Sequence, residues 1–113
     1  MIQYASRKET AMKVKVYHNM KPCFGENTFQ GFNSEHYEKV AVLELDNNSR
    51  FLKEAYRCTC HTSYNWTTNY DVIWFKNEQV RSTTVGDVIV DEFGNGFRCE
   101  SIGWEILGKV EAF

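Results

Sequence analysis

Residues 81–107, RSTTVGDVIVDEFGNGFRCESIGWEIL, carry the densest turn and strand signals in the chain and decide its fold class. The β-branched segment 85–90 predicts a strand, and 97–101 predicts its returning partner. The Gly-Asn-Gly sequence between them is typical of a hairpin turn, because glycine readily adopts positive φ angles. A last short strand is expected over 103–110. This part of the chain therefore predicts consecutive antiparallel strands.

Upstream of this stretch, two further strands are expected. The segment 13–18, KVKVYH, alternates between apolar and polar residues. This alternation puts Val14 and Val16 on one face and the other residues on the solvent face: Lys13, Lys15 and Tyr17. The segment 37–45, YEKVAVLEL, predicts a second strand antiparallel to the first.

The one helix is expected over 46–60, DNNSRFLKEAYRCTC. Asp46, Asn47 or Asn48 can cap its start, because their side chains accept hydrogen bonds from the first free backbone N–H groups. Its apolar stripe consists of Phe51, Leu52, Ala55, Tyr56 and Thr59. A short strand at 72–75 completes the elements.

Together the elements follow the order β-β-α-(β)-β-β-β. They predict an α+β fold, a mainly antiparallel sheet of about five strands with one helix packed on a face. We expect residues 1–11 to form a flexible N-terminal extension and residues 12–113 a single domain.

The composition bounds the function. The chain has 113 residues and a net charge of −2, which is too weak to favour nucleic-acid binding by bulk electrostatics. Aromatic residues make up 15% of the chain, more than a core of this size needs, so some are expected at a partner surface. The chain shows neither a long apolar run nor a secretory signal pattern. We therefore expect a cytoplasmic protein with reduced cysteines.

The cysteines suggest a metal site, but a poor one. Cys58, Cys60 and His61 are close in sequence, with Cys23 and Cys99 as distant further ligands. A structural zinc site normally uses two Cys-x₂₋₄-Cys knuckles, and here there is one Cys-x-Cys. We expect free cysteines, no metal and no cofactor.

No catalytic residues are assigned from the sequence. Cys60 and His61 are adjacent in sequence, whereas a working base is usually placed across space from its nucleophile. The Gly-rich segment FGNGF lacks the phosphate-loop spacing and a following helix. Asp87 after Gly86 is expected to stabilise a turn rather than to act on a substrate.

Two aromatic loops are candidates for partner contacts. In the loop 62–70, small polar residues separate Tyr64, Trp66 and Tyr70, which suits rigid aromatic anchors at an interface. The loop 19–36 contributes Phe24 and Phe29. The structural alternative is that Trp66 covers the open end of the core and that the phenylalanines pin their loop to it.

The stretch 81–107 also resembles a family of small, uncharacterised phage and actinobacterial proteins with an RSTSVGD[VI] motif followed by a hairpin and G[WF]. It is more distantly similar to YodL-like domains. Thr84 stands where the pattern often has serine. The resemblance implies a phage-type accessory protein, and it implies one structural unit made of Arg81, Ser82, Gly86, Asp87 and Trp104. Within that unit, Arg81 and Asp87 are expected to pair across the turn.

From these observations we expect a non-enzymatic phage accessory protein that binds a host protein or host defence complex in the host cytoplasm. One alternative is a nucleic-acid-associated protein that uses Lys13, Lys15 and Tyr17. A small metal-dependent hydrolase is the remaining alternative.

Overall fold

The computed structural model describes residues 11–20, 36–46, 49–60, 65–68, 71–77 and 79–110. The elements are β1 (Ala11–Asn19), β2 (Tyr37–Asp46), α1 (Phe51–Cys58), the 3₁₀ helix η3 (Trp66–Thr68), β3 (Val72–Phe75), β4 (Val88–Val90), β5 (Asn95–Cys99) and β6 (Trp104–Lys109). The α+β class and the element order are confirmed, with six strands where about five were expected.

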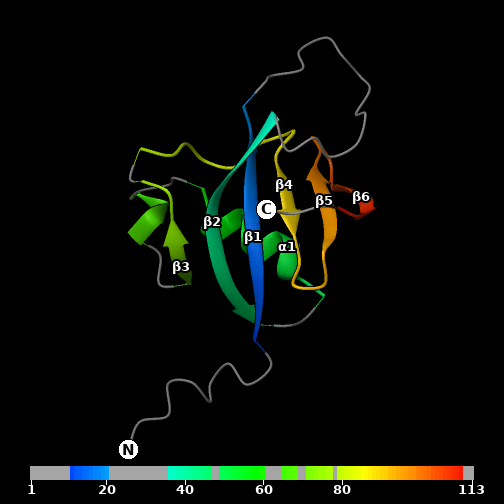
Figure 1. The fold of residues 1–113 in the computed structure, drawn as a ribbon, viewed down its shortest axis with the longest axis horizontal. Coiled ribbons are helices and arrows are strands. Elements are labelled where there is room, and N and C mark those ends of the chain that lie inside the picture. Colours follow the sequence, from blue (N-terminus) through cyan, green and yellow to red (C-terminus); the bar gives the residue numbers. More distant parts are fainter. Residues whose placement is uncertain are drawn as a thin grey trace, which may run out of the picture.

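One antiparallel sheet contains all of these strands, in the order β3-β2-β1-β4-β5-β6. Figure 1 shows β1 near the middle, β3 and β6 at opposite edges, and α1 against one face. β1 pairs on one side with β2, the next strand in the chain, and on the other side with β4, which comes much later in the chain. The hairpin expected within 91–97 is present between β4 and β5.

The main core lies between the sheet and α1. Val14, Val16, Leu43 and Ile89 are fully buried there from the sheet, and Ala55 from the helix. The expected alternation of β1 is thus confirmed for its two valines, because both point to the helix side.

The expectation that Tyr17 lies on a solvent face of β1 is wrong. Tyr17 is fully buried in a second apolar cluster with Tyr37, Val88 and Val90, and Leu107 packs against this cluster. Alternation correctly separates Tyr17 from Val16, but the opposite face of the sheet is also covered at this position. Tyr17 is therefore not on a solvent face, and the alternative nucleic-acid surface of Lys13, Lys15 and Tyr17 loses its aromatic member.

The start of α1 also differs from the prediction. The helix begins at Phe51, and Arg50 occupies the cap position without a side-chain hydrogen bond to the helix. Asp46 is the last residue of β2, where it pairs with Ala11, so it is not the cap. Asn47 and Asn48 lie outside the described residues.

The expected apolar stripe of the helix is confirmed only in part. Ala55 and Thr59 are buried, whereas Tyr56 is exposed. Val85, expected in a strand, lies in the turn before β4 and is 55% exposed. Both side chains therefore belong to the surface of the protein.

Among the described residues, no helix is long and apolar enough to span a membrane.

Candidate functional site

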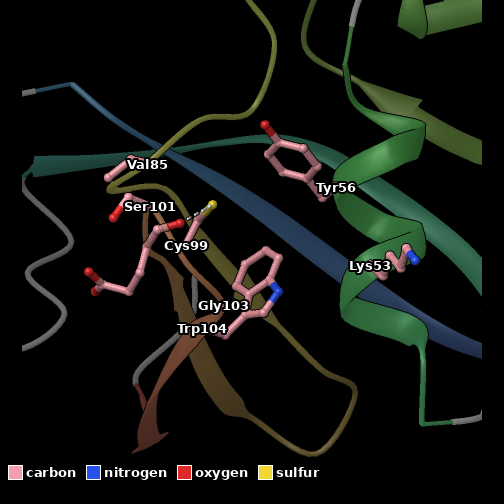
Figure 2. Close-up of a pocket in the computed structure, with 8 residues that line it drawn as sticks. Lys53, Tyr56, Val85, Cys99, Ser101, Gly103 and Trp104 are labelled. Atoms are coloured by element: carbon pink, nitrogen blue, oxygen red, sulfur yellow. Dashed lines mark hydrogen bonds between the residues drawn. The ribbon is translucent and has the colours of Figure 1, made fainter.

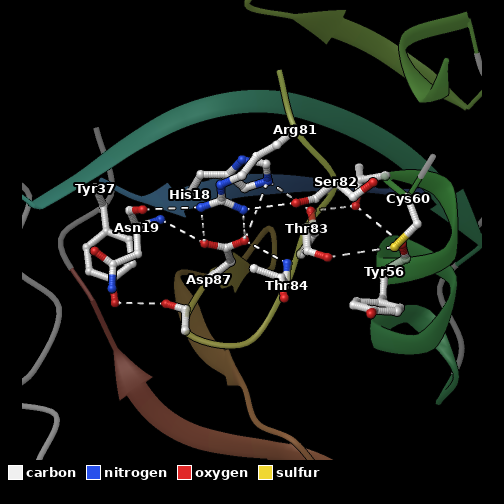
Figure 3. A network of polar contacts seen from close by, with 12 residues as sticks. His18, Asn19, Tyr37, Tyr56, Cys60, Arg81, Ser82, Thr83, Thr84 and Asp87 are labelled. Atoms are coloured by element: carbon white, nitrogen blue, oxygen red, sulfur yellow. Dashed lines mark hydrogen bonds and ion pairs between the residues drawn. The ribbon is translucent and has the colours of Figure 1, made fainter. Parts of the chain in front are cut away.

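A buried polar network joins the end of β1, the C-terminal end of α1 and the loop before β4 (Figure 3). Its centre is Asp87, whose side chain is completely buried. The Asp87 carboxylate accepts hydrogen bonds from the backbone N–H groups of Asn19 and Thr84, both at 2.8 Å. The Arg81 guanidinium supplies two more, at 2.7 and 2.9 Å. The expected pairing of Arg81 with Asp87 is confirmed.

Arg81 also ties the loop to β1. Its Nη2 donates to the Asn19 carbonyl at 3.2 Å, and its Nη1 donates to the Ser82 carbonyl. The hydrogen bonds to Asp87 raise the pKa of Arg81, although burial opposes this. The ion pair is therefore part of a backbone clamp between two segments that are far apart in sequence.

His18 extends the network toward the helix. Its Nε2 lies 3.0 Å from Thr83 Oγ1, which in turn lies 2.7 Å from Thr59 Oγ1. Burial lowers the pKa of His18 to about 4, although the Asp87 carboxylate 3.7 Å away acts in the opposite direction. The imidazole is thus neutral at pH 7. Because His18, Thr59 and Thr83 are all buried, their contacts join parts of the chain to one another and present no open group to a substrate.

Gly86 completes the turn that leads into β4. Its φ angle is +96°, a region that side-chain-bearing residues rarely adopt. Its N–H donates to the Cys99 carbonyl, and its carbonyl accepts a hydrogen bond from the Tyr37 hydroxyl. Of the unit expected from the resemblance, Arg81 is hydrogen-bonded to Ser82 and Asp87, and Gly86 directly precedes Asp87 in the same turn. Trp104, expected in the same unit, instead packs against Tyr56 of α1.

Cys58 and Cys60, at the C-terminal end of α1, contact different parts of the chain. Cys58 Sγ lies 3.7 Å from Asp71 Oδ2, whereas Cys60 Sγ contacts the Thr83 carbonyl. Burial raises the pKa of Cys58 to about 11 and also raises that of Cys60, so both thiols are protonated at pH 7. Within the described ranges, His, Cys, Asp and Glu side chains form no group of three or more that could hold a metal ion. Cys23 and His61 fall outside those ranges.

Trp66 was expected to be a partly exposed anchor, and this is wrong. It is 1% exposed within the main core, and its Nε1 donates to the Arg81 carbonyl at 3.1 Å. Asn65 holds the start of η3 by accepting hydrogen bonds from the N–H and hydroxyl of Thr67. The alternative interpretation, that Trp66 covers the open end of the core, is therefore the correct one. The other proposed contact residues lie outside the described residues: Phe24, Phe29, Tyr64 and Tyr70.

An open hollow of about 390 Å³ lies between α1 and the turn that joins β5 to β6 (Figure 2). Its lining consists of Lys53, Tyr56, Val85, Cys99, Glu100, Ser101, Gly103 and Trp104. The Tyr56 and Trp104 rings meet edge to face, with centroids 6.5 Å apart and planes at 82°. Burial raises the pKa of Cys99 to about 11, so its thiol is a neutral part of the lining.

Exposed aliphatic side chains come from the segments that line this hollow. Ile102, in the same turn as Ser101 and Gly103, is 92% exposed. Val85 is exposed on the loop before β4, and Ile106 is exposed on β6. We call Tyr56, Val85, Ile102 and Trp104 the hollow surface. Sequence reasoning missed it because its members come from segments that meet only in the folded chain.

Comparisons with family models, curated proteins and solved structures each found no match for this chain. The resemblance over residues 81–107 therefore stays a prediction. The function has to be inferred from the geometry of the hollow and its surroundings.

Proposed function

We propose that this chain is a small non-enzymatic protein-binding domain and that the hollow surface is where its partner binds. The observation that carries this proposal is the exposure of two aliphatic side chains at a hollow that contains an aromatic pair: Val85 lines the hollow, and Ile102 lies in the chain between two residues that line it, Ser101 and Gly103. Scattered apolar residues are ordinary on protein surfaces, but a group around a concave site is typical of an interaction site.

The aromatic pair suits an interface. Tyrosine and tryptophan contribute large contact areas at low cost in side-chain entropy, and they are enriched among the residues that dominate binding energy. Tyr56 and Trp104 are held by α1 and β6, so the partner would meet a preformed surface. Preorganisation of this kind lowers the entropy cost of association.

The resemblance to phage proteins suggests where this binding occurs. On this proposal the protein acts as a phage-type accessory protein in the host cytoplasm, and its partner is a host protein or a host defence complex. Neither catalysis nor a cofactor is part of the proposal, because the buried network around Asp87 is used to hold the chain together.

Affinity capture with matched variants tests the proposal. Tagged protein is incubated with bacterial lysate, and retained proteins are quantified by mass spectrometry. The variant with Val85→Asp and Ile102→Asp should lose a partner that the wild-type protein retains, because buried unpaired carboxylates are costly at an interface. Ile73→Asp is the control, since Ile73 is also exposed but lies on β3 at the opposite sheet edge. Equal capture by all three proteins would contradict the proposal.

A further inference from the structure

We propose that the hollow accepts an arginine side chain of the partner protein, next to a large aliphatic residue. The stem of this arginine would lie on the Tyr56 and Trp104 rings, and its guanidinium would bind the carboxylate of Glu100. This inference rests on the proposed protein-binding function and gives it a partner chemistry. It follows from the charges beside the hollow and from its aromatic surface.

The charges beside the hollow leave one carboxylate uncompensated. Glu100 lines the hollow, and Arg98 Nη2 lies 2.8 Å from its Oε2. The same Nη2 lies 3.1 Å from Oε1 of Glu105, so one guanidinium is shared between two carboxylates. Within the described ranges, no other cation lies within ion-pair distance of either glutamate. The two carboxylates and the one guanidinium therefore carry a net negative charge.

The negative groups are also the more accessible part of this ion-pair group. The side chain of Arg98 is 20% exposed, whereas those of Glu100 and Glu105 are 33% and 48% exposed. Lys53 also lines the hollow, but Figure 2 shows its nitrogen pointing away from the aromatic pair. A cation from a partner would therefore be attracted to the hollow at Glu100, and a carboxylate would be repelled.

The aromatic surface favours arginine over lysine as this cation. The Tyr56 and Trp104 rings contact each other edge to face, so they form one continuous surface. A guanidinium is planar, binds a carboxylate through two parallel hydrogen bonds and stacks on aromatic rings, while its apolar stem packs against the same surface. The ammonium group of lysine is a compact and strongly hydrated charge, so it gains less from these contacts.

The aliphatic neighbour of the arginine has its own contact at the hollow. Val85 lines the hollow and its side chain is exposed. The volume of about 390 Å³ is at the low end of the roughly 300–1,000 Å³ range for ligand pockets, which suits one or two side chains rather than a large cofactor. A segment with an aliphatic residue beside an arginine therefore matches both the charge and the apolar contacts of the hollow.

Titration with two peptides that differ by one charge tests the inference. The probes are acetyl-Leu-Arg-amide and acetyl-Leu-citrulline-amide, because citrulline keeps the shape of arginine but is neutral. They are added to ¹⁵N-labelled protein and followed by NMR, through the Trp104 indole and the amides of Tyr56, Cys99 and Gly103. The arginine peptide should bind roughly two- to five-fold more tightly than the citrulline peptide, as expected for one exposed ion pair. Added salt should reduce this preference, because it screens exposed charges.

Variants of the shared ion pair should change the preference in opposite directions. Glu100→Gln should abolish it, because the carboxylate at the hollow is lost, and Glu105→Gln should reduce it, because Arg98 then neutralises Glu100 alone. Arg98→Gln should increase the preference, because neither glutamate is then neutralised. Glu38→Gln is the matched control and should leave the preference unchanged, since Glu38 is similarly exposed but lies on β2, where Lys76 binds it. The ¹⁵N spectrum of each variant shows that its fold is retained.

The opposite results would overturn the inference. Equal binding of the two peptides to the wild-type protein, or a preference for arginine that survives Glu100→Gln, would exclude the proposed ion pair. If neither peptide shifts the signals of the hollow, the bound arginine is excluded as well. The proposed protein-binding function is judged separately, by whether the Val85 and Ile102 substitutions remove a captured partner, so the two failures can be told apart.

Discussion

Both terminal nitrogens of Arg81 bind the Asp87 carboxylate, with Nη1 2.7 Å from Oδ2 and Nη2 2.9 Å from Oδ1. The carboxylate is fully buried, while the guanidinium reaches the surface. Backbone N–H groups of Asn19 and Thr84 bind the same two oxygens. This single carboxylate therefore holds the loop before β4 against the end of β1.

Loss of this carboxylate should be among the most damaging changes in the protein. Asp87→Ala leaves two buried N–H groups and the Arg81 guanidinium without their acceptor, so the free energy of unfolding should fall by about 3 kcal/mol or more. Arg81→Lys keeps the charge but loses the paired geometry, and should cost about 1 kcal/mol. Urea unfolding measures the free energy of unfolding of both variants. Similar small losses, below about 0.5 kcal/mol, would show that the clamp contributes little to stability.

The sequence predicted the local parts of this fold well. Alternation located β1 and β2, and turn residues located the hairpin between β4 and β5. The pairing of Arg81 with Asp87 was also expected, from the resemblance that treats both residues as parts of one structural unit. Each of these features depends on interactions between close neighbours or on a regular pattern.

Features that depend on distant segments were not predicted. Alternation assigns Tyr17 to a face, but it does not show that Leu107 packs against the cluster on that face. The residues around Trp66 have a composition that suits an exposed loop and a segment that covers the core equally well. The sequence therefore does not show that the Trp66 indole donates to the Arg81 carbonyl. The hollow brings together α1, Val85 and the turn before β6, which only the folded chain places side by side.

Stability should depend on His18 between pH 6.5 and about 4. The folded-state pKa of His18 is lowered to about 4, below its ordinary value of 6.5. As the pH falls through this window, the unfolded chain binds a proton that the folded chain excludes, so the free energy of unfolding decreases. Between pH 6.5 and pH 4 and below, His18 lowers the free energy of unfolding by about 3 kcal/mol in total. Above pH 6.5 the protonation of His18 has no effect on stability.

A variant that lacks His18 isolates this effect. His18→Gln should be less stable at pH 7, because the contact with Thr83 is changed, but its stability should fall less steeply between pH 6.5 and 5. Urea unfolding at several pH values gives the two slopes. Equal slopes for the two proteins would mean that His18 titrates normally in the folded state.

Gly86→Val should destabilise the fold without changing partner binding by the folded protein. The φ angle of +96° is strained for a β-branched residue, and we expect a cost of roughly 1–3 kcal/mol. Space is not the limit, because a Cβ at this position would meet its nearest neighbour, Asn19 Nδ2, at 3.7 Å. Gly86→Asn should cost less, since asparagine tolerates positive φ better. An unchanged melting temperature combined with lost binding would instead assign Gly86 to the binding site.

Trp66→Ala should reduce the free energy of unfolding by about 3–5 kcal/mol, because it leaves a large cavity in the core. Trp66→Phe keeps much of the apolar volume but leaves the Arg81 carbonyl without its donor, so a loss of about 1–2 kcal/mol is expected. Chemical unfolding compares these variants. A stable Trp66→Ala protein that has lost its partner would restore Trp66 as an interface residue.

Site-specific photo-crosslinking at the hollow surface tests the central claim most directly. A benzoyl-phenylalanine residue placed at position 102, where Ile102 is 92% exposed, is irradiated in bacterial lysate. The same residue at position 73 on β3, where Ile73 is 49% exposed, provides the control. We predict that position 102 forms a covalent adduct with one predominant protein and that position 73 does not. Adduct formation at position 73 alone, or an identical pattern at both positions, would contradict the assignment of the hollow surface as the partner site.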